Sequence, residues 1–291
     1  MLGGHATARR AGGGAGLSEL LLPRDAWSRV DPATAGWRYL SFRVEALGAG
    51  DELHSESGEE ELALVPLAGS CTVRTAEGEW EVGGRADVFS GMPRSLYLPR
   101  DTTFTLRATS DAEIAVCGAR AERRGEPRPI PPEDVEIEVR GAGNATRQIN
   151  HIVKPEFPAE RLLVVEVYTP SGNWSSYPPH KHDEDHGERE AVLEETYYFR
   201  ARAEPPGAFA VQRLYSPTHG VDLTATVRDG DLLLVPWGYH TTCAAHGHDL
   251  YYLNALAGDR RTMAAADDPE LAWIRPAWSE LEQDPRAPLV M

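Results

Sequence analysis

Short stretches in which apolar and polar residues alternate recur along the chain, separated by turn-forming residues. A period of two is typical of β-strands with one buried face. Helical periodicity is confined to the C-terminal "DPELAWIRPAWSELEQ", which predicts one short helix that starts at Asp268-Pro269 and is broken at Pro276. The predicted strands are Trp37–Ala46, Glu61–Leu67, Ser70–Thr75, Leu96–Leu98, Phe104–Ala108, Glu113–Ala119, Val135–Val139, Leu162–Tyr168, Glu195–Arg200, Phe209–Tyr215, Leu223–Arg228, Asp231–Val235 and Leu250–Leu256. Many short strands at close spacing predict an all-β sandwich or barrel.

The strands fall into two blocks of similar length, which suggests a duplicated barrel. The charged, Pro-rich "ERRGEPRPIPP" between them disfavours both helix and sheet. We therefore predict a mobile tail (residues 1–16), an N-terminal domain without metal ligands (17–121), a linker (122–134) and a C-terminal metal-binding domain (135–291). The stretches "GGRADVFSGMPRSLYLP" and "RDGDLLLVPWGYHTTC" resemble each other as a glycine turn, an apolar strand and a Pro-containing loop. Of the two, the second alone contains a histidine, His240.

Composition narrows the class of protein further. Apolar residues make up 41% and charged residues 25%, as in soluble globular proteins. A formal charge of −16 argues against nucleic acid as a partner but not against a small anionic substrate, which responds to the local field of a pocket. Cys71, Cys117 and Cys243 lie in apolar, strand-like sequence, so we expect buried free thiols in a reducing cytosol. No run of 18 apolar residues and no convincing signal peptide occur, which predicts a cytoplasmic protein without a membrane partner.

The histidines indicate metal chemistry in the second block. Eight of the ten lie after residue 150, and His180 and His182 are two apart. In an extended strand such a pair points to one face, so the two imidazoles can occupy adjacent positions on one metal ion. His240 follows a Pro/Gly turn in "VPWGYH", where its side chain can be aimed into a barrel mouth. A polar loop is the alternative interpretation of "HKH" taken alone.

A carboxylate completes the predicted site. In "LEETYYFR", Glu195 shares a strand face with Tyr197 and Phe199, the side expected to face a barrel interior, whereas Glu194 falls on the more polar face. We therefore choose Glu195. Three imidazoles and a carboxylate suit Zn, Mn, Fe or Ni about equally. The expected cofactor is one divalent ion of this group, with no organic cofactor.

The order H-x-H, Glu, P-x-G-x-H resembles the two short motifs of the cupin superfamily, although a loop, Asp183–Glu194, lengthens the usual spacing. The stretches "NWSSYPPHKHD", "LEETYYF", "QRLY", "DGDLLLVPWGYH" and "LYYLNALAG", with "LVPLAG", "GGRADVF" and "LYLP" in the first block, are similar to the 5-deoxy-glucuronate isomerases of inositol degradation. That family implies a bicupin of two β-barrel domains, each a double-stranded β-helix of the jelly-roll type. The resemblance is weakest over residues 1–16 and after about residue 275.

The resemblance implies an aldose–ketose isomerase that converts 5-deoxy-D-glucuronate to 5-dehydro-2-deoxy-D-gluconate. A metal ion then acts as a Lewis acid toward the enediolate. The implied metal ligands are His180, His182, Glu195 and His240. The candidates for the general base are Glu195, Tyr252 and Tyr197, and for each tyrosine the alternative is a packed strand residue.

The anionic sugar acid requires a positive group, because arginine can hold a carboxylate through two parallel hydrogen bonds. Arg213 and Lys181 are the first choices, followed by Arg147. Strand alternation allows only one of Gln212 and Arg213 to line the barrel, and it sets Lys181 opposite its two histidine neighbours. The Asp183–Glu194 loop is either a lid over the site or a solvated excursion.

Three other functions fit the same residues. They are the related uronate ketol-isomerase of pectin breakdown, an Fe(II) cupin dioxygenase, and a non-enzymatic sugar-binding bicupin. Oxygen dependence separates the dioxygenase from the isomerases. A homo-oligomer is expected at the level of the superfamily, because cupins often pair through sheet edges.

Overall fold

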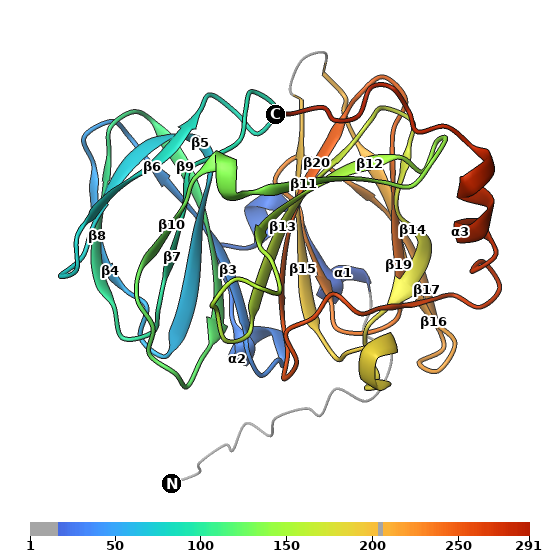
Figure 1. Cartoon of the computed structure of the whole chain (residues 1–291), viewed down its shortest axis with the longest axis horizontal. Coiled ribbons are helices and arrows are strands. Elements are labelled where there is room, and N and C mark those ends of the chain that lie inside the picture. The colour runs from blue at the N-terminus through green and yellow to red at the C-terminus, as the bar shows by residue number, and fades with distance from the viewer. Residues whose placement is uncertain (1–16, 203–205) are drawn as a thin grey trace, which may run out of the picture.

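The computed structural model describes residues 17–202 and 206–291, so the predicted mobile tail lies outside the described residues. The described chain is almost entirely β-structure, as predicted, and forms two halves side by side (Figure 1). The helices within it are α1 (Leu17–Leu20), η1 (Arg24–Ala26), α2 (Pro32–Ala35), η2 (Pro132–Asp134), η3 (Gly187–Arg189), α3 (Ile274–Ala277) and η4 (Trp278–Glu280). No helix in these ranges is long and apolar enough to cross a membrane.

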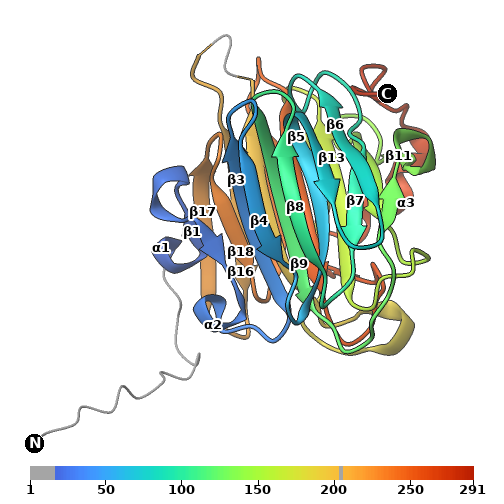
Figure 2. The ribbon, with the colours of Figure 1, turned by 90° about the vertical axis from the view of Figure 1, so that its left-hand side faces the viewer.

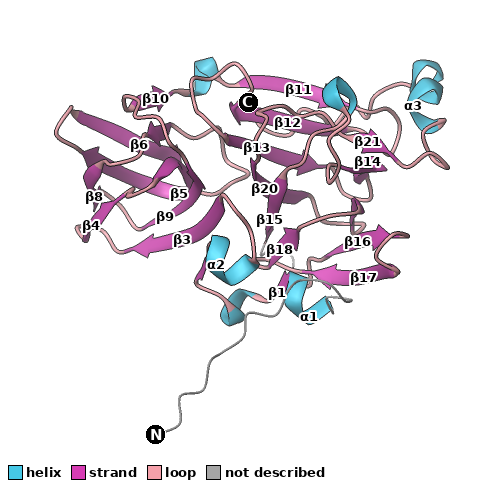
Figure 3. Cartoon of the chain, turned by 90° about the horizontal axis from the view of Figure 1, so that it is seen from below, coloured by secondary structure: helices cyan, strands magenta, loops and turns pink. Residues whose placement is uncertain are grey.

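Two antiparallel sheets of the described chain form the second half. The larger sheet has the order β1 (Leu21–Leu22), β18 (Leu232–Val235), β15 (Glu194–Ala201), β20 (Leu250–Ala257), β13 (Leu162–Thr169), β12 (Arg147–Val153) and β11 (Glu136–Arg140). The smaller sheet has the order β17 (Val221–Val227), β16 (Ala210–Ser216), β19 (Tyr239–Ala244), β14 (Trp174–Lys181) and β21 (Ala266–Asp267). Figure 3 shows this half from below, with α3 at its outer end.

The first half is built around one long strand, β5. The main row is β10 (Arg128–Ile130), β7 (Ser95–Leu98), β5 (Glu60–Arg74), β9 (Ala112–Arg120), β3 (Leu40–Leu47) and β2 (Arg29–Val30), with β4 (Glu52–Glu56), β6 (Glu79–Arg85) and β8 (Thr103–Ala108) attached through the far end of β5. Figure 2 views this half face-on, with β4 and β8 toward the reader. The sheets of both halves are open, so each predicted barrel is a sandwich of facing sheets that hydrogen bonds do not close into a ring.

The predicted strands Glu61–Leu67 and Ser70–Thr75 are one bent strand, β5. The bend lies at Gly69, whose φ of +76° is in the left-handed region. A Cβ atom there would lie 2.0 Å from the backbone oxygen of Asp111, so only glycine fits without rearrangement. The bend lets β5 pair with β7 and β9 first and with β6 and β8 afterwards.

The two halves repeat the same strand order. The row β10-β7-β5-β9-β3-β2 matches the row β1-β18-β15-β20-β13-β12 strand for strand. Each half receives an edge strand from the segment that precedes the other half. Leu21–Leu22, before the first half, pairs with β18 of the second half, and Arg128–Ile130, before the second half, pairs with β7 of the first half. The repeat therefore supports duplication. The division into residues 17–121, 122–134 and 135–291 stays a prediction, because edge strands cross it in both directions.

Four sequence-based expectations need correction. The Pro-rich linker is not free of sheet, because Arg128–Ile130 forms the edge strand β10, where a proline is tolerated. The C-terminal helix begins at Ile274 and includes Pro276, which lies in its first turn, where no intrahelical N–H bond is required. The "ADVF" part of the repeated motif is a turn, and the matching apolar strand is Ser95–Leu98. The three cysteines are free as expected, but Cys243 is only half-buried.

A continuous apolar core joins the two larger sheets across the interface between the halves. Phe42 of β3 packs against Tyr198 of β15 with ring centres 5.5 Å apart, and Trp27 contacts both rings. The buried cluster extends through Val65 and Cys117 on one side and Val164, Tyr251 and Leu253 on the other. The halves are therefore one packed unit.

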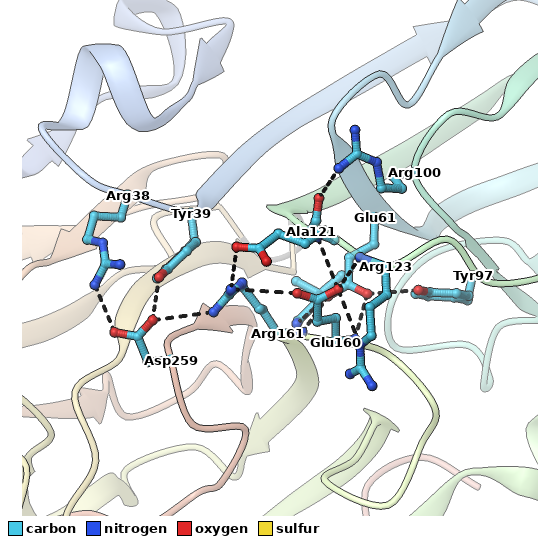
Figure 4. A network of polar contacts seen from close by, with 12 residues as sticks. Arg38, Tyr39, Glu61, Tyr97, Arg100, Ala121, Arg123, Glu160, Arg161 and Asp259 are labelled. Carbon is cyan, nitrogen blue, oxygen red and sulfur yellow. Dashed lines mark hydrogen bonds and ion pairs between the residues drawn. The ribbon is translucent and has the colours of Figure 1, made fainter.

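Two glutamates reinforce the interface reciprocally. Glu61 of the first half accepts the backbone N–H groups of Glu160, Arg161 and Leu162 at 2.7, 2.6 and 2.8 Å, and the hydroxyl of Tyr97 at 2.8 Å (Figure 4). Glu194 of the second half accepts the backbone N–H groups of Arg38, Tyr39 and Leu40 at 2.5, 3.0 and 2.9 Å. Glu194, which was not chosen as a metal ligand from the sequence, thus fixes the start of β3.

Candidate metal centre

Strands β14, β15 and β19 bring the predicted metal ligands together inside the second half. His180 in β14 is the register partner of His240 in β19, so the two side chains share a face. Glu195 is the second residue of β15, in the opposite sheet of the sandwich. His182 directly follows the end of β14 at Lys181.

Glu195 lies at the centre of a buried trio. Its Oε2 atom is 2.9 Å from Nε2 of His182 and 3.3 Å from Nε2 of His240. One potential ligand atom from each of the three residues lies within 4.8 Å of the others. All three side chains are buried. This spacing is compact enough for one cation to contact all three.

His180 lies beside this trio. Its ring centre is 4.6 Å from that of His240 and 6.4 Å from that of His182, although its nitrogens do not fall within the 4.8 Å group. Its Nδ1 atom is buried, and it has no hydrogen-bond partner among the described residues. His180 is thus placed as a fourth donor, adjacent to the other three.

Backbone carbonyls orient two of the imidazoles. Nδ1 of His182 lies 3.0 Å from the oxygen of Leu193, and Nδ1 of His240 lies 3.1 Å from the oxygen of Gly238. With a proton on each Nδ1, both Nε2 lone pairs face Glu195, the pattern of metal-binding histidines. Nε2 of His240 is buried without a hydrogen-bond partner in the described chain. Such unpaired atoms cost free energy that a cation would offset, so the donor set fits a divalent metal ion.

Burial and charge act in opposite directions on these groups. Burial lowers the pKa of His180 well below its usual value, and the neighbouring His240 and His182 lower it further. Burial also opposes the charge on His182, but the hydrogen bond and charge of Glu195 outweigh it and raise its pKa. Burial raises the pKa of Glu195, but the neighbouring imidazoles of His182 and His240 outweigh it and lower its pKa to about 2. The carboxylate is therefore ionised at neutral pH, as a metal ligand must be.

A group of hydroxyls lies next to the cluster. Tyr252 Oη is 2.5 Å from Ser175 Oγ and 3.3 Å from Ser176 Oγ, and Ser176 Oγ is 3.0 Å from Tyr197 Oη. The Tyr197 ring centre is 5.6 Å from that of His240. Burial raises the pKa of both tyrosines, that of Tyr197 well above its usual value. Both phenols thus stay protonated at neutral pH and can donate hydrogen bonds.

Arg147 is the positive group that the fold places toward this interior. It is 3% exposed, and no carboxylate pairs with it among the described residues. Its Nη1 atom donates to the oxygens of Ala145 and Tyr177 at 3.1 and 3.2 Å. Burial and nearby arginines lower the pKa of Arg147 to about 10, and its charge contributes to the lowered pKa of His180. A buried arginine without a counter-ion is suited to bind an anion.

The other predicted substrate contacts lie in different surroundings. Arg213 is turned outward and pairs with Asp222 at 2.7 Å. Lys181 donates to Asp183, Glu184 and Glu190 at 2.6, 2.9 and 2.9 Å. Arg213 and Lys181 thus each have carboxylate partners, whereas Arg147 has none among the described residues.

Gln212 lies on the inner face of the smaller sheet. It is the register partner of Thr242, which also bonds to its side-chain oxygen, and it shares a face with Leu214 and His240. Side-chain alternation along β16 thus places Gln212 inside the sandwich and Arg213 outside it.

The Asp183–Glu194 loop is tied down by charged contacts. Glu190 accepts a hydrogen bond from the Lys181 ammonium. It also accepts hydrogen bonds from the backbone N–H groups of Asp183 and Glu184 at 3.1 and 3.0 Å. Asp183 accepts the N–H of Gly238 at 2.7 Å, two residues before His240. Although Glu184, His186 and Glu190 lie close together, the Lys181 ammonium already contacts both glutamates. This group, in which Glu184 and His186 are exposed and Glu190 is buried, is therefore a salt-bridge cluster.

The first half offers no equivalent centre. Neither group of metal-ligand side chains found in residues 17–202 and 206–291 lies there. Strands β5 and β9 of the first half correspond to β15 and β20 of the second. Glu61 of β5 pairs with Ala119, and Glu194 of β15 pairs with Ala257 in the same way. The next residue of β5, Leu62, therefore takes the position that Glu195 has in β15. Leu62 belongs to an apolar cluster that fills the first sandwich. This supports the prediction that the N-terminal domain lacks metal ligands.

The sequence carries no local signal for Ser175, Ser176 and Trp278. The serines precede Tyr177 and the two prolines in "SSYPPHKH", but hydroxyls in a strand carry no signal of their own. Trp278 lies over Arg147, with its ring centre 5.8 Å from the guanidinium carbon. Its partner is far away in sequence, so no local pattern could have indicated the contact.

Two packed β-sandwiches, with a His/Glu cluster inside the second, define a protein of the cupin fold class. An oxalate decarboxylase from Lactobacillus farciminis shares this fold, with a TM-score of 0.60 and 14% identity over 88% of this chain and 90% of that chain. More specifically, the chain belongs to the KduI/IolB family, whose model matches residues 23–274.

Relatives within the family are similar over most of their length. A 5-deoxy-glucuronate isomerase of Geobacillus thermodenitrificans NG80-2 is 45% identical over 248 residues, which is 84% of this chain and 90% of that protein. The one from Bacillus subtilis 168 is 40% identical over 84% of this chain and 91% of that protein. The crystal structure of an IolB-like protein from Salmonella typhimurium LT2 matches with a TM-score of 0.84 and 37% identity, covering 88% of this chain and 99% of that chain. The family resemblance inferred from the motifs is thereby confirmed.

Proposed function

We propose that the protein is a metal-dependent 5-deoxy-glucuronate isomerase that converts 5-deoxy-D-glucuronate to 5-dehydro-2-deoxy-D-gluconate. The supporting observation is the buried His182–Glu195–His240 trio beside His180, inside a fold whose relatives carry this activity by name. The reaction moves one proton between adjacent carbons and needs no redox cofactor. The relatives' names favour this substrate over the uronate of pectin breakdown.

A divalent ion held by His180, His182, Glu195 and His240 would supply Lewis-acid stabilisation of the enediolate oxygens. The carbonyl contacts of His182 and His240 keep their Nε2 atoms aimed at this position, which lowers the cost of organising the site. Gln212 and Thr242 on the same sheet face as His240 present polar groups to the sugar hydroxyls.

The proton-transfer groups divide according to their pKa values. Because the pKa values of Tyr197 and Tyr252 are raised, these phenols serve as hydrogen-bond donors to substrate oxygens. Of the three predicted candidates for the base, Glu195 is the one that is ionised at neutral pH. We therefore retain Glu195 as the group that accepts the proton when its coordination to the metal ion loosens, with the tyrosine hydroxyls orienting the substrate.

The activity itself is tested with and without metal and oxygen. The purified protein is expected to turn over 5-deoxy-glucuronate under argon, to lose activity after EDTA treatment and dialysis, and to regain it when Zn²⁺, Mn²⁺, Fe²⁺ or Ni²⁺ is added back. Product formation and bound metal are measured on the same samples. Turnover that survives complete metal removal would contradict the mechanism, and a strict requirement for oxygen would favour an Fe(II) dioxygenase.

Arg147 is proposed to bind the substrate carboxylate. Replacing Arg147 by methionine is expected to raise KM for 5-deoxy-glucuronate about tenfold or more, because one charged hydrogen-bonded contact contributes about 1.5–3 kcal/mol. Steady-state kinetics of the variant check this. Arg213→Met is the matched control, since Arg213 is paired with Asp222 on the outer face. A larger KM change in the Arg213 variant would reverse the assignment.

A further inference from the structure

The chain after the family match wraps around the part of the second half that carries Arg147. The family model ends at residue 274, and residues 278–290 lie beyond it. In Figure 1 this segment runs from α3 along the upper edge of the second half to the C-terminus between the halves. Its contacts converge on the turn between β11 and β12 and on the first residues of β12, where Arg147 is located.

Trp278 covers the guanidinium of Arg147. Its ring centre lies 5.8 Å from Cζ of Arg147 and 5.5 Å from Cζ of Arg275, so it stands between two positive groups. Arg275 is itself paired with Asp267, whereas Arg147 has no such partner in the described chain. The indole face therefore supplies the cation contact that a carboxylate would otherwise make.

The same segment also forms hydrogen bonds with Thr146, the residue before Arg147, and with the turn that precedes it. Thr146 Oγ1 accepts the backbone N–H of Asp284 at 2.9 Å, and Asn173 links the Thr146 oxygen to the Asp284 carboxylate at 3.1 and 3.0 Å. Gln283 donates to the oxygens of Val139 and Gly141 at 2.9 and 3.3 Å. The turn is thus bonded to residues 283–284 at several points.

The residue after Arg147 is held in the same way. Gln148 Oε1 accepts the backbone N–H groups of Leu289 and Val290 at 2.6 and 3.0 Å, and its Nε2 donates to the Val290 oxygen at 2.6 Å. Gln148 is fully buried, and Val290 packs into the interface core. Residues on both sides of Arg147 are therefore fixed by one segment.

We propose that residues 278–290 are a positioning element that holds Arg147 buried and aimed at the carboxylate of the sugar acid. The inference rests on the proposed function, because it assigns the anion at Arg147 to the substrate. An unpaired buried guanidinium gains hydration if it swings outward, so its place must be enforced by its surroundings. The Trp278 ring opposes that outward movement, while the clamps on Thr146 and Gln148 fix the backbone that carries it.

The test compares the acid substrate with its neutral carboxamide. Trp278→Ala is expected to raise KM for 5-deoxy-glucuronate about tenfold, to change kcat less than about threefold and to leave KM for the carboxamide within about twofold. Trp278→Phe restores most of the affinity, because an aromatic face remains. Trp273→Ala is the matched control, since Trp273 is 65% exposed and lies outside the contacts with Arg147. Bound metal is measured in every variant.

The outcomes separate the inference from the function on which it rests. If wild-type protein does not turn over 5-deoxy-glucuronate, the proposed function fails. If Arg147→Met raises KM for the acid but Trp278→Ala does not, the function stands and the positioning role is wrong. Equal losses for the acid and the carboxamide in Trp278→Ala also overturn the role. Should Trp278→Ala not fold, Thr146→Val, which removes the hydroxyl that accepts the Asp284 N–H without removing the ring, is expected to show the same selective rise in KM.

Discussion

Replacing His182 by alanine is expected to remove bound metal and to lower kcat/KM about 1000-fold or more. His182 contributes an Nε2 atom 2.9 Å from Glu195 Oε2, so its loss opens one side of the trio. A Lewis acid contributes several kcal/mol to the stabilisation of transition-state charge, and each 1.36 kcal/mol is a factor of ten in rate. Metal analysis and isomerase kinetics on the same preparation measure both effects.

The matched control for this experiment is His54→Ala. His54 is exposed on β4 of the first half and bonds to Thr105 at 2.9 Å, far from the cluster in sequence and in the sandwich. Its replacement is expected to leave metal content and activity near those of the wild type. If His182→Ala keeps a full complement of metal and wild-type turnover, the assignment of the trio as the metal centre is contradicted.

Replacing Glu166 by glutamine is expected to lower the free energy of unfolding by about 3–5 kcal/mol. Glu166 of β13 pairs with Arg85 of the first half at 2.6 Å, and both side chains are fully buried. Tyr168 and Tyr251 complete the group, since Arg85 donates to Tyr168 at 3.2 Å and Tyr251 donates to Glu166 at 2.9 Å. The variant leaves the Arg85 charge buried without its counter-ion. Urea unfolding followed by circular dichroism measures the loss.

An exposed ion pair in the first half calibrates this result. Arg74 pairs with Glu79 at 2.8 Å, with side chains 73% and 50% exposed, so Glu79→Gln is expected to cost less than about 1 kcal/mol. Replacing Arg85 and Glu166 together by methionine is expected to cost less than Glu166→Gln alone, since no unpaired charge then remains. Equal losses for Glu166→Gln and Glu79→Gln would show that the buried pair does not hold the halves together.

Much of the strand content could be predicted because alternation is a local property. The predicted strands Leu162–Tyr168 and Leu250–Leu256 match β13 and β20 within one residue at each end. Strands β4 and β6 were missed, since their outer faces are exposed and their apolar positions few. The bend at Gly69 was missed too, because it depends on the approach of Asp111 from another part of the chain.

The candidate site was predicted to the extent that face alternation decides it. A period of two separated Glu195 from Glu194, and the structure places Glu195 in the cluster and Glu194 on the backbone of β3. The same rule separated Gln212 from Arg213 but could not say which of them faces inward. The inner face becomes defined only when β16 pairs with β19 and the second sheet covers it.

The sequence by itself determined the all-β class and the face on which the carboxylate of the His/Glu cluster lies, since these follow from alternation within single strands. The tertiary structure alone decided which positive residue lies near the cluster. Arg213 and Lys181 form ion pairs with carboxylates in nearby loops and strands. Arg147 is instead buried by the turn before its strand, by Tyr177 and by Trp278. Trp278 lies more than a hundred residues further along the chain than Arg147. Whether a charge is paired depends on contacts between distant segments, which no local pattern records.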